Sequence, residues 1–390
     1  MFAVFASLRK TLNRLVVFYV LIALAACQTT TVGTGQSIDT AAPVPVALLV
    51  PHGAQGINEQ KLARDLENAA RLAVSDLVGV EVDLRVYPTA GSTANAQSSA
   101  LQAVEDGAKI IVGPLRGEAA NAVSLAMAPK NINVLAFSNN ASIAGGNLFV
   151  LGQTFEDTAN RLMGIAASQG KRTVLTVHSR NLAGTTGRDA ILQAVANNGL
   201  NSAGTVSYDF TQDGVINAIP AIKSAAESNQ ADTIFLTANA AGALPLFSQL
   251  LPENGLTSDV TQLVGLSRWD TPPQTLDLPG VQGGWFALPD PQRTAQFESR
   301  FGAAFGERPH PLAGLSYDAI AAIGALAQSG DPDALSRGSF TQGAGFQGVN
   351  GIFRFNQRGT TERGLAVATI DAKQVVVLSP APRSFDSAGF

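Results

Sequence analysis

The sequence has very few of the residues that enzymes most often use for nucleophilic, redox or metal chemistry. Cys27 is the only cysteine among 390 residues and lies close to the N-terminus, which excludes internal disulfides and a thiol site in the body of the chain. The three histidines, His52, His178 and His310, lie far apart without metal-binding spacing. The patterns GxSxG, GxxxxGK[ST] and a GxGxxG following a strand are missing as well. We therefore predict that the chain is not an enzyme and needs no metal or cofactor.

Charged residues are also scarce. They make up 14% of the chain, against roughly 25% in an average soluble protein. Hydrophobic residues make up 46%, the formal net charge is −4 and the isoelectric point is near 5.5. These values indicate a globular chain with buried strands, long enough for two domains, and they argue against nucleic acid as a partner.

The N-terminus resembles a targeting segment. The first residues of the chain include two arginines and one lysine. The apolar run Leu15–Ala23 follows them and is too short to span a bilayer. The run leads into Leu24-Ala25-Ala26-Cys27, which resembles the lipobox of bacterial lipoproteins. The resemblance implies a signal peptide at residues 1–26 and lipidation of Cys27. A plain signal peptide with a cysteine near the cut, or an uncleaved anchor, are the alternatives.

A polar segment follows the cysteine. Residues 28–45 are rich in Thr, Gly, Ala and Pro and show no periodicity, so we expect residues 27–45 to form a flexible tether. In many Gram-negative lipoproteins an Asp directly after the cysteine retains the protein in the inner membrane, whereas Gln28 stands here. We therefore expect a lipid-anchored protein of the cell envelope that faces the periplasm, with the outer membrane favoured.

One stretch, Ile110–Ser142, contains the pattern of a βαβ unit. Ile110–Val112 is a short apolar run typical of a buried strand. Apolar residues then recur with helical spacing from 119 to 127, Pro129 ends this helix, and a second buried strand follows at 132–137. Small and polar residues come directly after both strands, and these carboxyl ends are where open parallel sheets bind ligands.

Several segments of the chain together are similar to a known family. They are GPLRGEAANAVSLAMAPKNINVLAFSNNAS from Gly113 on, LSYDA at 315–319 and FQGVNGIFRF at 346–355. They resemble type I periplasmic binding proteins of the leucine/isoleucine/valine-binding family, over about residues 45–380. The resemblance implies an α/β fold with two Rossmann-like lobes, whose parallel sheets are joined by crossover strands and close on ligand like a Venus flytrap.

The chain contains two series of alternating strands and helices of similar size, which fit such a division into two lobes. We assign residues 46–150 plus 283–330 to the first lobe and 151–282 plus 331–380 to the second, with 381–390 as a tail. Trp269 and Trp285 either line the cleft between the lobes or pack inside them.

The resemblance also implies ligand-binding residues. On the first lobe they follow the two strands of the βαβ unit, and on the second lobe they lie in two loops: Leu115, Arg116, Gly117, Ser138, Asn139 and Asn140, then Asn181 and Asn239. A cation at a helix N-terminus opposes the helix dipole, so Arg116 either points into solvent or faces an anionic ligand or partner. Residues 138–140 could equally be helix-cap and turn residues.

The second lobe departs from the pattern of amino-acid binders. Those proteins have an aromatic residue in the loop that matches 179–184, and an aromatic and an acidic residue near 237–243. Here the two segments read SRNLAG and TANAAGA. An ammonium group enclosed without a counter-charge is costly, so an ordinary amino-acid ligand is doubtful.

Two functions therefore stand side by side. One resemblance is to outer-membrane lipoproteins that activate penicillin-binding proteins and so regulate peptidoglycan synthesis. It rests on the lipobox, on the VLAFSNN segment and on a second lobe without the aromatic and acidic residues of amino-acid binders. The helical-repeat domain of those activators is missing. We favour this hypothesis. The alternative is the substrate-binding component of an ABC importer for amino acids or another small polar ligand. The expected partner is accordingly a penicillin-binding protein or an ABC permease, with a small polar or anionic ligand as a further possibility.

Overall fold

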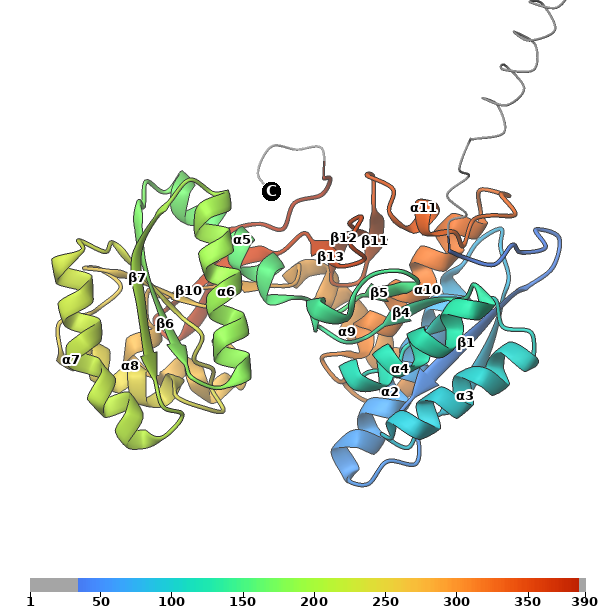
Figure 1. The fold of residues 1–390 in the computed structure, drawn as a ribbon, viewed down its shortest axis with the longest axis horizontal. Helices are drawn as coiled ribbons and strands as arrows, with labels where there is room; N and C mark the ends of the chain where they lie inside the picture. Colours follow the sequence, from blue (N-terminus) through green and yellow to red (C-terminus); the bar gives the residue numbers. More distant parts are fainter. Residues whose placement is uncertain (1–33, 386–390) are drawn as a thin grey trace, which may run out of the picture. The chain divides into compact units, whose positions relative to one another are not determined.

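The computed structural model describes residues 34–385 and forms two α/β lobes, each built on its own sheet (Figure 1). The predicted signal peptide and Cys27 lie outside the described residues. The first sheet has five strands in the order β2-β1-β3-β4-β5, and the second has seven in the order β15-β14-β10-β9-β8-β6-β7. The predicted α/β class is confirmed.

All neighbouring strands of the first sheet are parallel: β1 (Val44–Val50), β2 (Val82–Pro88), β3 (Ile110–Val112), β4 (Asn133–Ala136) and β5 (Leu148–Val150). Helices α3 (Thr93–Glu105) and α4 (Gly117–Met127) pack on one face, and α2 (Ile57–Asp76) and α10 (Ala313–Ala327) pack on the other. The predicted βαβ unit is present as β3-α4-β4. Helix α4 ends at Met127, and the short 3-10 helix Ala128–Lys130, which contains Pro129, follows it.

Gly113 ends β3 in a conformation that a larger residue could not adopt. Its φ is +88°, and a Cβ atom there would lie 2.3 Å from the carbonyl oxygen of Leu49. The close approach of β3 to β1 at this point therefore depends on glycine. The Gly113 N–H donates to the Leu135 carbonyl at 2.8 Å, which extends the pairing of β3 with β4 into the loop.

The second lobe has a parallel core of β6 (Thr173–Ser179), β7 (Asn201–Tyr208), β8 (Thr233–Leu236), β9 (Gln262–Gly265) and β10 (Trp285–Leu288), followed by antiparallel β14 (Ala366–Asp371) and β15 (Gln374–Ser379). Helices α5 (Phe155–Ser168) and α6 (Leu182–Asn197) cover one face, and α7 (Gln212–Ser228) and α8 (Leu244–Glu253) cover the other. Both tryptophans belong to the cores on these two faces, so their role is packing.

The division between the lobes differs from the expected one at two places. Strand β10 lies in the second sheet, although residues 283–330 were expected in the first lobe. Residues 331–363 pack on the first lobe, although 331–380 were expected in the second. They form α11 (Arg337–Phe340), β11 (Phe346–Gly348), β12 (Gly351–Phe355) and β13 (Thr361–Arg363). Phe340, Phe353 and Phe355 join the core around Phe149, and this aromatic cluster explains the difference.

The described part of the expected tether does not fit the prediction. Residues 34–43 lie on the first lobe, where Ile38 is 6% exposed and belongs to its core. The Ile38 N–H donates to the Pro332 carbonyl at 2.8 Å, and the Asn133 amide donates to the Thr34 carbonyl at 3.1 Å. Lack of periodicity was therefore no sign of flexibility here, because long-range hydrogen bonds hold this segment.

Three passes of the chain connect the lobes. They run from β5 to α5, from β10 to α9 (Pro291–Phe305), and from β13 to β14. The resemblance implied such crossovers.

Candidate ligand-binding site

A cavity of about 520 Å³ lies at the carboxyl ends of β3 and β4, next to all three passes between the lobes. Its lining comes from the two strand-end loops, the crossovers, the start of α10 and the β11–β12 turn: Leu115, Arg116, Gly117, Phe137, Ser138, Asn139, Gly152, Gln153, Pro289, Pro311, Leu312, Leu315, Asn350, Arg363 and Leu365. Most of these side chains are apolar, and the polar ones carry hydrogen-bond donors. Such a cavity suits a small, partly apolar ligand.

The loop after β4 brings Ser138 to the start of α4. Ser138 is 6% exposed, and its Oγ accepts a hydrogen bond from the Asn140 N–H at 3.1 Å. A Cβ atom on Gly117 would lie 3.3 Å from this Oγ, so the hydroxyl sits against the first turn of α4. Among the residues that the structure describes, no side chain caps this helix. Its first N–H groups thus have no capping partner, and helix N-termini of this kind bind anions.

Arg116 precedes α4 and pairs with an acid of α2. Its Nη2 donates to Glu59 Oε1 at 2.9 Å, and the Arg116 side chain is 58% exposed. The side chain therefore lies at the rim of the cavity with its charge partly satisfied. Arg116 thus reaches solvent and also lines the cavity, and its role toward an anionic ligand or partner stays a prediction.

Arg363 forms the wall of the cavity nearest the crossovers. Its guanidinium donates from Nη1 to Asp318 Oδ2 on α10 at 2.9 Å and from Nη2 to the Leu151 carbonyl at 2.8 Å. The Asp318 Oδ1 accepts the Val349 N–H at 2.8 Å, and a Cβ atom on Gly348 would lie 2.3 Å from that oxygen. Burial raises the pKa of Asp318, and the charge of Arg363 opposes this rise.

Asp157 of α5 connects the second lobe to the same wall. Its Oδ1 accepts the backbone N–H of Arg363 at 3.0 Å, while its Oδ2 is buried without a partner among the described residues. Burial raises the pKa of Asp157 to about 7, although the Arg363 N–H and charge act in the opposite direction. This carboxyl therefore changes charge near neutral pH at the start of α5.

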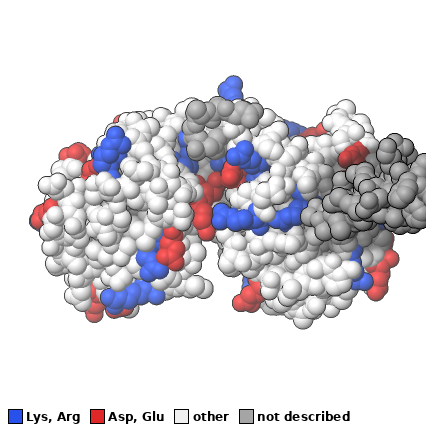
Figure 2. All heavy atoms as spheres, turned by 45° about the horizontal axis from the view of Figure 1, so that its top comes forward, with Lys and Arg blue, Asp and Glu red and all other residues white. Residues whose placement is uncertain are grey.

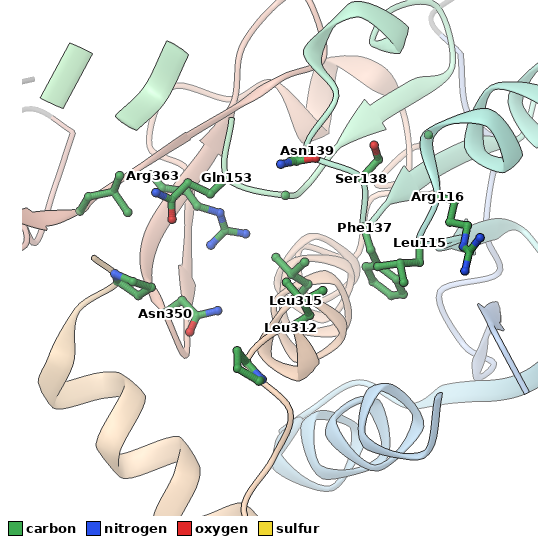
Figure 3. Close-up of a pocket in the computed structure, with 15 residues that line it drawn as sticks. Leu115, Arg116, Phe137, Ser138, Asn139, Gln153, Leu312, Leu315, Asn350 and Arg363 are labelled. Atoms are coloured by element: carbon green, nitrogen blue, oxygen red, sulfur yellow. The ribbon is translucent and has the colours of Figure 1, made fainter. Parts of the chain in front are cut away.

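The apolar part of the lining faces these polar groups. Figure 3 shows Leu312 and Leu315 at the start of α10, between Phe137 and Leu115 on one side and Gln153 and Asn350 on the other. Leu312 is 38% exposed, whereas Leu315 and Phe137 are 6% and 3% exposed. A ligand in the cavity would contact hydrocarbon in its middle and hydrogen-bond donors at its ends.

The predicted site residues do not all come together. Five of them line the cavity: Leu115, Arg116, Gly117, Ser138 and Asn139. Asn140 does not line it, because its Oδ1 caps a short 3-10 helix by accepting the N–H of Ser142 at 3.0 Å. Asn181 and Asn239 line a second, smaller cavity of about 110 Å³ on the second lobe.

The two asparagines of the second lobe, Asn181 and Asn239, differ in hydrogen bonding and exposure. Asn181 caps α6, and its Oδ1 accepts the Gly184 N–H at 2.8 Å and the Ser179 hydroxyl at 2.9 Å. Asn239 is exposed. Burial raises the pKa of Tyr208, which lines the same cavity, to about 12, so its hydroxyl stays neutral.

The crossover side of the cavity was missed from the sequence. Gln153, Pro289, Asn350, Arg363 and Leu365 belong to segments that are far apart in the chain. The segments 315–319 and 346–355 were noticed as family-like, yet nothing in them marked Asn350 as lining a cavity. Only the three passes of the chain bring these residues together.

Other kinds of site find no support in the part of the chain that the structure describes. Within residues 34–385, no group of three His, Cys, Asp or Glu side chains could hold a metal ion. Among the described helices, none is both long and apolar enough to cross a membrane.

Residues 43–374 match the profile of the family described as periplasmic binding protein. Since this covers most of the chain, the chain belongs to the periplasmic binding protein family, whose members are typically non-enzymatic proteins of the cell envelope, as predicted. The fold is that of type I, as in leucine-binding proteins. No curated protein matches the sequence significantly.

Solved structures with the same fold include proteins described as ABC transporter components. A branched-chain amino acid ABC transporter periplasmic ligand-binding protein from Burkholderia xenovorans is 16% identical, with 89% of this chain and 97% of that chain covered and a TM-score of 0.69. A substrate-binding protein from Desulfitobacterium hafniense in complex with Leu is 17% identical, with 86% and 100% covered and a TM-score of 0.63. A solute-binding protein from R. palustris in complex with benzoate is 15% identical, with 89% and 99% covered and a TM-score of 0.57.

Proposed function

We propose that this chain is the solute-binding component of an ABC importer and holds its solute in the first-lobe cavity. The observation that carries the proposal is the position of this cavity, at the ends of β3 and β4 and against all three passes between the lobes. A ligand there contacts the segments that must bend when the lobes move, so binding can be reported to a transporter. The family and the transporter components of like fold support this function over the activator function that we favoured from the sequence.

The chemistry of the cavity supports the same proposal. The first turn of α4 and the Ser138 hydroxyl offer donors to an anionic group, and the leucine side chains of α10 offer an apolar surface. The volume of about 520 Å³ lies in the range of small-molecule sites.

A binding panel tests this function. The purified full chain is mixed with each of the twenty protein amino acids, benzoate and short-chain fatty acids, and the shift of the unfolding midpoint is recorded. We expect at least one compound to raise the midpoint and to bind with a micromolar Kd in calorimetry, because ligands of the native state stabilise it. If no compound of the panel binds even at millimolar concentration, the solute-binding function is wrong.

The lipid anchor belongs to this proposal as well. The lipobox-like segment before Cys27 supports acylation, and Gln28 supports the outer membrane. Several acyl chains together give a stable anchor. We expect the wild-type chain to incorporate labelled palmitate and to fractionate with the outer membrane, and Cys27→Ala to do neither. Palmitate incorporation by Cys27→Ala would contradict the anchor.

Activation of a penicillin-binding protein is a second candidate. The observation that favours it is the second-lobe cavity, which is lined by no charged side chain and thus lacks the acid that amino-acid binders use. Under this hypothesis the pure chain binds a bifunctional penicillin-binding protein and raises its rate of peptidoglycan synthesis. Neither effect is expected of an importer component.

A further inference from the structure

Strand β15 lies at one edge of the seven-stranded sheet, next to β14. It reads QVVVLS, and its four consecutive apolar side chains are 37–45% exposed: Val375, Val376, Val377 and Leu378. The other large apolar side chains that are exposed within residues 34–385 stand singly along the chain. In the described part of the chain, β15 is therefore the longest exposed run of large apolar residues.

The other three edges of the two large sheets are each protected against further pairing. Edge strand β2 carries two charged residues and ends at Pro88. Edge strand β7 is mostly polar, and its register with β6 shifts next to Gly204. Edge strand β5 is three buried residues long, and its Val150 N–H donates to the Gly359 carbonyl at 2.8 Å. Devices of this kind prevent edge-to-edge association, whereas β15 contains neither a charged residue nor a proline.

Residues Gln374–Val377 form the regular part of this edge. They pair residue by residue with β14, and the register shifts only beyond Val377. In an antiparallel ladder every second residue directs its N–H and C=O away from its neighbour, so the edge presents backbone donors and acceptors in β geometry. The chain leaves the sheet at Pro380, and Phe385 packs against Arg354 of β12, whose guanidinium carbon lies 4.4 Å from the ring centre. The described segment after β15 thus leads away from this edge.

The two ends of β15 carry opposite charge. Asp371 lies at the hairpin end and Arg383 follows the other end, and both are exposed and have no ion pair among the described residues. Lys373 at the hairpin end is paired with Asp277 at 3.1 Å. An antiparallel strand of the same sequence would bring the acidic end of each copy next to the basic end of the other, whereas a parallel strand would bring like ends together. The edge is therefore complementary to itself in antiparallel orientation.

The overall charge opposes association of two copies only weakly. The formal net charge is −4 over 390 residues. Figure 2 shows charged side chains in small groups, with broad uncharged areas between them on the face in view. Repulsion over long distances needs a strong field of one sign, so a second copy can approach this edge.

We propose that β15 pairs with β15 of a second copy of this chain, in antiparallel orientation around a twofold axis. The two seven-stranded sheets then form one continuous sheet, and the apolar side chains of each edge are covered by the other copy. A twofold interface uses the same surface on both copies and leaves no further β15 edge open, so the assembly stops at a dimer. Gln374–Ser379 line neither ligand cavity, and the interface is therefore independent of the proposed solute binding.

Charge substitution at the edge tests this proposal. Val376→Lys and Val376→Glu each bring like charges together near the twofold axis, and Val260→Lys places a charge on a valine outside β15 that is 69% exposed. Sedimentation equilibrium of the full chain in density-matched detergent measures the Kd of the dimer. We expect Val260→Lys to dimerise like the wild type and each Val376 variant to dimerise at least tenfold more weakly. A mixture of the two Val376 variants should associate at least tenfold more tightly than either alone, because opposite charges then meet.

Three outcomes would overturn the proposal. The first is a wild type that stays monomeric up to its solubility limit, whatever else covers the edge. The second is a dimer whose Kd does not change in Val376→Lys, since its interface then lies elsewhere. The third is a mixture that associates no better than its components, provided that both variants show the circular dichroism of the wild type.

Hydrogen exchange locates the interface without any substitution. Peptides that contain Gln374–Ser379 should exchange more slowly at a concentration above the Kd of the dimer than after dilution below it, because outward N–H groups of β15 then donate to the second copy. Peptides that contain β7, at the other edge of the same sheet, should exchange at the same rate under both conditions. Equal exchange of β15 at the two concentrations would contradict the proposal.

Discussion

Arg363 and Asp318 form a buried ion pair at the junction of the two lobes, with 2.9 Å between Nη1 and Oδ2 and side chains that are 4% and 0% exposed. Arg363 belongs to the strand that leads into the third pass, and Asp318 belongs to a helix of the first lobe. The same guanidinium holds the Leu151 carbonyl of the first pass. Two of the three passes are thus tied to α10 through one side chain.

Loss of this arginine should be strongly destabilising. Removing one member of a buried ion pair leaves the other charge uncompensated and costs about 3–5 kcal/mol, so we expect Arg363→Met to lower the free energy of unfolding by this amount in urea titrations. Arg180→Met is the matched control, because Arg180 pairs with Asp209 at the surface and such pairs contribute less than about 1 kcal/mol. Similar losses in both variants would show that burial of the pair is unimportant.

The titration of Asp157 makes the stability of the chain depend on pH. Its folded pKa is about 7, against 3.8 for an ordinary Asp, so the folded state holds a proton that the unfolded state releases. Stability therefore falls as pH rises from about 4 to about 7 and is then constant. One unit of pKa difference corresponds to about 1.4 kcal/mol, so the loss between pH 5 and pH 7 is roughly 2–3 kcal/mol.

Asp157→Asn should remove this dependence, since an amide keeps an oxygen for the Arg363 N–H and does not titrate in this range. We expect the variant to gain stability over the wild type at pH 8 and to gain little at pH 5. Urea unfolding at both pH values measures the difference. A constant difference across this range would mean that Asp157 is ionised throughout.

Arg116 should contribute modestly to anion binding because it is exposed and shares its charge with Glu59. Exposed charges interact by about 0.2–1 kcal/mol, so we expect Arg116→Ala to weaken binding of an anionic compound of the panel, such as benzoate, about two- to fivefold and to reduce the dependence of this binding on salt. Arg180→Ala should change neither, since Arg180 lines neither cavity. A hundredfold loss in Arg116→Ala would place its guanidinium directly on the ligand.

Asn133 should hold residues 34–43 on the first lobe. It is fully buried, and its Nδ2 donates to the Leu335 carbonyl at 2.8 Å and to the Thr34 carbonyl at 3.1 Å. We expect Asn133→Ala to cost about 1–3 kcal/mol of unfolding free energy, because it removes the donor to the buried Leu335 carbonyl. The Thr34 carbonyl keeps a partner, since it also accepts the Arg337 N–H at 2.7 Å. Asn197→Ala, at an exposed asparagine of α6, should stay within about 0.5 kcal/mol. If Asn133→Ala is as stable as the wild type, Asn133 does not hold residues 34–43 on the first lobe.

Local pattern was sufficient to predict most of the elements but not their assembly. The apolar run at β3, the helical spacing of α4 and the proline at its end each depend on neighbouring residues. Whether residues 331–363 belong to the first or to the second lobe depends instead on contacts between residues that are distant in sequence, such as that of Phe149 with Phe340. The same holds for the cavity, since Arg363 and Gln153 meet only because the chain crosses between the lobes three times.

The most direct test asks whether solute binds in the first-lobe cavity. Leu312→Trp fills part of the cavity from a position that is 38% exposed, and Leu125→Trp adds the same bulk on an exposed position outside its lining. The wild type and both variants are titrated calorimetrically with the compound of the binding panel that the wild type binds most tightly. We predict that the ligand bound by the wild type binds equally to Leu125→Trp and at least tenfold more weakly to Leu312→Trp. Wild-type affinity in Leu312→Trp, or no binding of any compound of the panel to the wild type, would contradict the account.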